Sequence, residues 1–137
     1  MVGLIWLIQL VHYPLFAGVG SQGWRVWHER HSSQITPLVG VLMAVEGLSY
    51  LMLLSEPMGT LGRRLFLASG VLLALHLCST AFVQVPLHGK LGAGHDEATI
   101  AQLVRTNWIR TFAWTGRGVL VAWLMVLVLR GDAEVAA

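Results

Sequence analysis

Four long runs of apolar residues divide the chain, and most polar positions gather in the short stretches between them. Each run is close to the roughly 20 residues that an α-helix needs to cross the hydrocarbon core of a bilayer. The third connection, Leu87–Arg105, alone has room for structure outside the membrane. The pattern predicts an all-α integral membrane four-helix bundle, one domain over residues 1–137, with short loops. The expected transmembrane helices are Val2–Val19, Gln34–Leu54, Leu65–Leu87 and about Thr106–Leu129.

Residues that begin helices refine these boundaries. The first run lacks the basic segment of a signal peptide, so we expect it to stay in the protein as a helix. Ser32 or Ser33 is a suitable N-cap for the second helix, which places Pro37 in its first turn, where proline is tolerated. Asp96 or Thr99 is expected to begin a short helix that leads into the fourth span.

Composition supports a membrane protein. Of 137 residues, 55% are hydrophobic and 12% are charged, against roughly 25% charged residues in soluble domains. The net charge is +2, and no basic patch with interleaved aromatic residues lies outside the spans, which argues against a nucleic-acid partner. We expect a multi-pass protein of a bacterial cytoplasmic membrane, in contact with lipid and a hydrophobic small molecule, and forming a homodimer or part of a larger membrane complex.

Ionisable residues lie near the middle of all four runs. Glu46 is the one charge within Gln34–Leu54, and His12, His76 and Arg117 occupy the other three runs. A charge at this depth is costly, so it usually faces a partner or a water-filled cavity. We expect a Glu46–Arg117 ion pair with both histidines nearby. Such a pair serves either as a structural contact between helices or as a site of proton transfer.

A second polar layer is expected nearer one membrane face. Residues three or four apart share a helical face. His28 and His31 are three apart, and Gln84 and His88 are four apart, so each pair is expected to lie on one face of its helix. Polar stripes on the third and fourth helices join the two layers, and such stripes suit a cavity or a proton path. The layer contains His28, His31, Gln84, His88, Asn107 and Arg110.

Histidines at similar depth raise the question of a metal. His28, His31 and His88 offer three imidazoles, which suit iron, copper or zinc. His12 and His76 lie on different helices and are candidates for bis-histidine haem. The bulk of Pro14 and the charge of Glu46 argue against a porphyrin, so a metal ion is favoured over haem and the cofactor stays open.

Two stretches in the C-terminal half resemble the anthrone-oxygenase-like family of small four-helix membrane proteins. They are Ser79–Leu91, which contains Val-Pro-Leu-His, and Leu103–Thr111, which contains Asn-Trp-Ile-Arg. One departure is His88, where that family often has Asn. The resemblance implies four spans and an oxygenase-like activity, with a site rim formed by Pro86, His88, Asn107, Trp108 and Arg110. Asn107 and Trp108, together with His76, are candidates for contacting a cofactor.

These features predict a membrane-embedded oxidoreductase or oxygenase-like enzyme that acts on a hydrophobic aromatic or quinone-like substrate. Glu46 or His12 would accept a proton, and Arg110 or Arg117 would stabilise negative charge on an enolate or phenolate oxygen. Two alternatives stay open, a non-catalytic subunit of a larger membrane complex and a small proton-coupled carrier.

Overall fold

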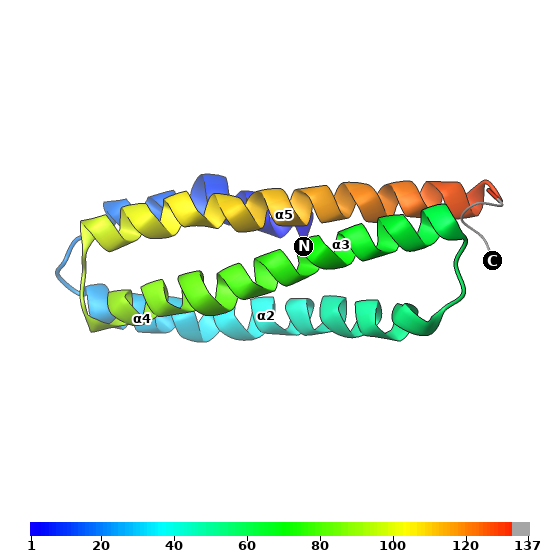
Figure 1. Cartoon of the computed structure of the whole chain (residues 1–137). Coiled ribbons are helices and arrows are strands. Elements are labelled where there is room, and N and C mark those ends of the chain that lie inside the picture. The colour runs from blue at the N-terminus through cyan, green and yellow to red at the C-terminus, as the bar shows by residue number, and fades with distance from the viewer. Residues whose placement is uncertain (133–137) are drawn as a thin grey trace.

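Three long helical stretches lie side by side in the computed structural model, which describes residues 1–132 (Figure 1). The first is α2, Trp24–Met52, extended by the short 3-10 turn η3, Leu53–Ser55. The second comprises α3, Thr60–Ser79, the π turn η4, Thr80–Gln84, and α4, Val85–Ala93. The third is α5, Glu97–Leu129. All three are long and apolar enough to cross a membrane, as expected of a multi-pass membrane protein.

The N-terminal segment completes the all-α fold but differs from the straight span that the sequence predicts. It consists of α1, Val2–Leu7, the π turn η1, Ile8–His12, and the 3-10 turn η2, Pro14–Gly18. Pro14 has no amide hydrogen and a fixed φ, so a regular α-helix does not continue through it. The result is an apolar helical segment shorter than the three long ones.

The N-terminal segment also covers only part of the bundle. Met1 and Val2 lie beside Arg117 and Gly118, near the middle of α5 (Figure 1). A Cβ atom at Gly118 would come within 2.7 Å of the Val2 side chain, so glycine permits this close approach. From here the segment runs toward the end of the bundle that contains α4.

Both α2 and α5 begin earlier than expected. α2 starts at Trp24, so Ser32, Ser33 and Pro37 lie inside it and the predicted cap is wrong. The reason is a buried stripe formed by Trp24, His28 and His31, which extends the helix beyond the apolar run.

α5 begins at Glu97, and Asp96 is its N-cap, as the sequence suggested. The Asp96 carboxylate accepts a hydrogen bond from the Thr99 backbone N–H at 3.0 Å. The stretch that we expected to be a separate short helix is therefore the first part of one continuous helix.

Pro86 does not end the third stretch, which continues to Ala93. The π turn η4 ends at Gln84, two residues before Pro86, and accommodates a proline that would otherwise clash with the preceding turn. In the same turn, the Thr80 hydroxyl donates to the His76 carbonyl oxygen at 2.7 Å. The turn changes the direction of its own side chains relative to a regular α-helix, among them Gln84.

The buried core lies between the N-terminal segment, α4 and α5. It is built around Ile5, Phe16, Trp24, Leu91 and Leu103, each at most 1% exposed. α2 packs against α4 at this end and leaves most of its remaining surface apolar and exposed, as expected of a helix that faces lipid.

Candidate functional site

A cavity of about 170 Å³ lies where all four segments of the chain meet. Its apolar lining comes mainly from the N-terminal segment and α2: Ile8, Ile35, Val39 and Met43. Its polar lining comes from every segment and comprises Tyr13, His31, Thr36, Thr80, Gln84, His88 and Arg110. Of the second polar layer expected from the sequence, His31, Gln84, His88 and Arg110 line this cavity, whereas His28 and Asn107 do not.

Both π turns found within residues 1–132 border this cavity. η1 contributes Ile8 and is followed directly by Tyr13, whereas η4 contributes Thr80 and Gln84. A π turn inserts a residue into the helical repeat and is often found at functional sites. The two irregular turns therefore place side chains toward one volume that regular helices would direct elsewhere.

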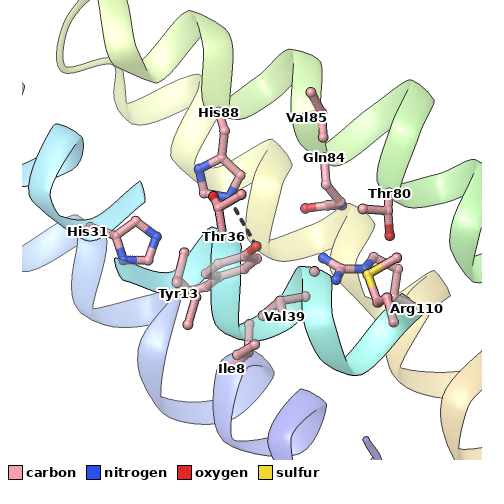
Figure 2. Close-up of a pocket in the computed structure, with 13 residues that line it drawn as sticks. Ile8, Tyr13, His31, Thr36, Val39, Thr80, Gln84, Val85, His88 and Arg110 are labelled. Carbon is pink, nitrogen blue, oxygen red and sulfur yellow. Dashed lines mark hydrogen bonds between the residues drawn. The ribbon is translucent and has the colours of Figure 1, made fainter. Parts of the chain in front are cut away.

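Tyr13, His88 and Arg110 approach one another from three different elements (Figure 2). The Tyr13 hydroxyl and His88 Nε2 are 3.1 Å apart and form a hydrogen bond. Arg110 lies close enough to interact electrostatically with the same hydroxyl. Tyr13 is 5% exposed and Arg110 is 3% exposed, so this contact is shielded from solvent.

Arg110 is held from behind by polar side chains. Its Nη1 donates to Asn107 Oδ1 at 3.2 Å, and Asn107 Nδ2 donates to Gln9 Oε1 at 2.9 Å. The guanidinium also lies over the Trp114 ring, 5.1 Å from its centroid. Within residues 1–132, no carboxylate forms a salt bridge with Arg110. The guanidinium charge is therefore positioned by neutral groups and remains uncompensated at the cavity.

Three buried polar atoms on the residues lining the cavity have no hydrogen-bond partner in the described part of the chain: His31 Nε2, Gln84 Oε1 and Arg110 Nε. The amide nitrogen of Gln84 donates to the Thr106 hydroxyl at 3.0 Å, which fixes the orientation of the side chain. Buried polar groups are seldom left without partners. Donor and acceptor groups of a bound molecule would satisfy these atoms.

The three histidines of the polar layer and His12 form two pairs. His12 Nε2 lies 3.1 Å from His31 Nδ1, and His28 Nε2 lies 3.3 Å from His88 Nδ1. Trp24 stacks on His28 and Trp27 stacks on His31, each with ring centroids 5.7 Å apart.

The structure brings together the three histidines proposed as metal ligands, His28, His31 and His88, whose ring centroids lie 5.6 to 6.1 Å apart. Among residues 1–132, however, no group of three or more His, Cys, Asp or Glu side chains is arranged to hold a metal ion. The ring nitrogens face one another in pairs, whereas a metal needs several donors that converge on one point.

A second polar cluster surrounds Glu46, away from the cavity. Arg117 Nη1 lies 2.5 Å from Glu46 Oε1, and the Trp114 indole donates to Glu46 Oε2 at 2.7 Å. His76 Nε2 lies 3.6 Å from the same oxygen, and its ring stacks on Trp114 with centroids 4.1 Å apart. The expected Glu46–Arg117 pair with His76 nearby is confirmed.

His12 does not join the Glu46 cluster, contrary to expectation. That expectation requires a full transmembrane span from Val2 to Val19, but Met1 lies beside Glu46 and Arg117, at the middle of the bundle. His12 consequently lies farther along, next to His31. Neither His12, Glu46 nor Arg117 lines the cavity, whereas Arg110 does.

The remaining candidates occupy different places. Asn107 is fully buried behind Arg110. Trp108 lies on another face of α5, where it contacts Trp6 edge-on with ring centroids 5.7 Å apart, and it does not line the cavity. Tyr13 lines the cavity but was not among the predicted site residues. The available signal was a tyrosine between His12 and Pro14 inside an apolar run.

No protein-family model, curated protein or solved structure matches the chain. The resemblance to the anthrone-oxygenase-like family therefore stays a prediction. The geometry of the cavity is the basis for assigning a function.

Proposed function

We propose that the protein is a membrane-embedded oxidoreductase or oxygenase-like enzyme that binds one ring of a hydrophobic aromatic or quinone-like substrate in this cavity. The observation that carries the proposal is the buried Arg110, which faces an otherwise largely apolar cavity without a carboxylate partner among residues 1–132. A buried charge is costly unless something compensates it. A phenolate, enolate or quinone oxygen would provide that compensation.

The size of the cavity limits what enters it. An engineered apolar cavity of about 150 Å³ in another protein binds benzene, so about 170 Å³ suits a single ring with an oxygen substituent. Thr36, Gly40 and Val85 line the cavity and are exposed on the surface of α2 and α4. Further rings or an isoprenoid tail would extend past these residues into lipid, which is also the route by which an apolar substrate would enter.

The lining residues supply proton transfer and charge stabilisation. Gln84 Oε1 would accept a hydrogen bond from a ring hydroxyl, and Arg110 would stabilise the oxygen once it carries negative charge. His88, linked to Tyr13, would accept the proton. Glu46 and His12 lie outside the cavity, so this proposal gives the role of proton acceptor to His88.

Dioxygen would be the co-substrate of an oxygenase reaction of the kind that the family resemblance implies. A substrate CH2 group and O2 give a C=O group and water, so one oxygen atom enters the product and the other leaves with both hydrogens. The protein would remove the first proton and hold the resulting enolate in an environment without bulk water. The electrons then pass from the enolate to dioxygen.

A turnover assay tests this proposal. The protein in lipid nanodiscs is given anthrone or reduced menadione, and oxygen uptake and product formation are followed. Arg110→Gln should lower the rate about 10- to 100-fold, in line with the loss of a charge-assisted hydrogen bond. Arg105→Gln is the matched control, because Arg105 is exposed on the same helix and does not line this cavity. Equal rates in the two variants, or no turnover of either compound by the unmodified protein, would contradict the proposal.

A further inference from the structure

Tyr13 and His88 belong to a longer chain of hydrogen bonds. The Tyr13 hydroxyl contacts His88 Nε2 at 3.1 Å, and His88 Nδ1 contacts His28 Nε2 at 3.3 Å. An imidazole has two ring nitrogens, so it can receive a proton at one and release a proton from the other. The three side chains therefore form a continuous series of groups that can exchange protons.

The outer end of the series lies at the molecular surface. His28 lines a cleft of about 570 Å³ together with Arg25, Glu29, Ser33 and Gly92. These four neighbours are exposed, and the cleft lies between the start of α2 and the end of α4. Charged residues at the ends of apolar spans are typical of the membrane–water interface. His28 thus connects a polar surface with the buried cavity.

Buried side chains pack around the outer part of the series. Trp24 is 1% exposed and stacks on His28, and its indole donates to the Leu91 carbonyl oxygen at 2.7 Å. Leu87 and Leu91 are also buried on α4, on either side of His88 in the sequence. His31 stacks near His88 with centroids 5.8 Å apart, but its hydrogen bond goes to His12.

We propose that Tyr13, His88 and His28 form a proton path between the cavity and water at the membrane face where α2 begins and α4 ends. The proposal deepens the proposed function, because the proton removed from a substrate must leave the cavity and reach water. The path itself exists without substrate.

The transfer balances at each atom. Tyr13 gives its hydroxyl proton to His88 Nε2 and takes the substrate proton in its place. His88 releases the proton on Nδ1 to His28 Nε2, and His28 releases the proton on its Nδ1 to water in the cleft. Arg110 at the inner end repels positive charge on His88, whereas Glu29 at the outer cleft attracts it and Arg25 opposes it. Reorientation of the two rings restores the original tautomers.

Nuclear magnetic resonance of nitrogen-15 histidine-labelled protein in nanodiscs tests the path without substrate. The exchange of the His88 ring proton with water is measured in the unmodified protein and in His28→Asn. The variant should exchange about 100-fold more slowly, the lower range of what a positioned proton-transfer group contributes. His95→Asn is the matched control, because His95 lies at the same face and contacts Trp24 edge-on at 4.8 Å outside the series.

Tyr13→Phe separates the two ends of the path. It removes the inner link only, so the His88 ring proton should exchange with water as in the unmodified protein. The proposal is overturned if His28→Asn leaves the exchange unchanged, or if Tyr13→Phe slows it as much as His28→Asn does. If His28→Asn fails to fold, exchange rates in the unmodified protein provide the test. The His28 ring proton should then exchange with water faster than the His88 ring proton. The reverse order would overturn the path.

The outcomes separate the two proposals. If the unmodified protein turns over neither compound but its His88 ring proton still exchanges with water through His28, the proposed function is refuted and the proton path stands. Turnover by a protein whose His88 exchange does not depend on His28 refutes the path alone.

Discussion

Arg110 and Arg117 lie on the same helix, yet the structure gives them different surroundings. Arg117 pairs with Glu46 at 2.5 Å, whereas Arg110 contacts only neutral side chains within residues 1–132. The paired arginine satisfies the general requirement that charge in a membrane finds a partner. The unpaired arginine faces the cavity. This contrast indicates that the Glu46 cluster is mainly structural and that Arg110 is available to a ligand.

Glu46→Gln tests the structural role. The substitution leaves the Arg117 charge without its carboxylate, and breaking a buried pair costs about 3 to 5 kcal/mol, with the lower end expected here because both side chains are 13–14% exposed. The melting temperature in detergent should fall, while turnover per folded molecule stays unchanged. Glu56→Gln, in the exposed turn after η3, is the control and should leave the melting temperature unaltered. A variant with unchanged stability and lost turnover would move the catalytic site to Glu46.

At the scale of single elements, the apolar runs correctly identified where helices lie but not where they end. Both α2 and α5 extend beyond their apolar runs. In α2 the reason is the buried stripe of Trp24, His28 and His31, and in α5 it is the N-cap Asp96, which begins one continuous helix. The π turns were not predictable, since they depend on how Pro14 and Pro86 are accommodated by packing. These turns determine which side chains reach the cavity, so the site could be located only in part from the sequence.

Pro86→Ala tests whether η4 shapes the cavity. Without the proline ring, residues 80–93 can form a regular α-helix, which would rotate Thr80 and Gln84 relative to α4. Since small misplacements in a site can cost about 100-fold, turnover should fall by about that factor while helix content is preserved. Pro37→Ala, inside α2 and outside the cavity lining, is the control. Unchanged turnover in Pro86→Ala would show that the π turn is dispensable.

Asp96→Ala tests the cap of α5 and its dependence on pH. Hydrogen bonds from Thr99 lower the pKa of the Asp96 carboxyl below its ordinary value. A lowered folded-state pKa means that the cap stabilises the protein above the ordinary carboxyl pKa of about 3.9. This contribution is lost as the pH falls through the lower folded-state value.

The melting temperature of Asp96→Ala should therefore be lower than that of the unmodified protein by a constant amount between about pH 5 and pH 8. The difference should shrink in more acidic solution. Asp132 is remote from this cap, and Asp132→Ala should not reproduce the effect. A difference that grows toward acidic pH would contradict the assignment of the cap.

At the scale of the whole molecule, the short N-terminal segment closes one side of the cavity. It brings Ile8 and Tyr13 to the lining and Gln9 to the network behind Arg110. The sequence indicated four helical segments, but depth counted along an assumed full span placed His12 beside Glu46. His12 instead lies beside His31, because the N-terminal segment begins at the middle of α5. Tertiary packing determines that starting point, so the sequence pattern did not reveal it. Residues 133–137 of the expected domain lie outside the described residues.

Gly118→Val tests how the N-terminal segment is held. A Cβ atom at Gly118 would approach the Val2 side chain to 2.7 Å, so valine should push the segment away from α5. Overpacking of this kind costs about 1 to 3 kcal/mol, and displacement of Tyr13 should reduce turnover as well. Gly3→Val is the control, because no atom lies within 4 Å of a Cβ at Gly3. Equal stability and turnover in both variants would show that the close approach is unimportant.

The central claim is that Arg110 makes the cavity a binding site for an aromatic ring with an anionic oxygen. It is tested most directly by titrating the nanodisc protein with p-nitrophenol and following the absorption of the phenolate. We predict saturable binding with one ligand per chain and an increased phenolate fraction, both retained in Arg105→Gln and lost in Arg110→Gln. A titration without saturation beyond partitioning into empty nanodiscs, or one unaffected by Arg110→Gln, would contradict the claim.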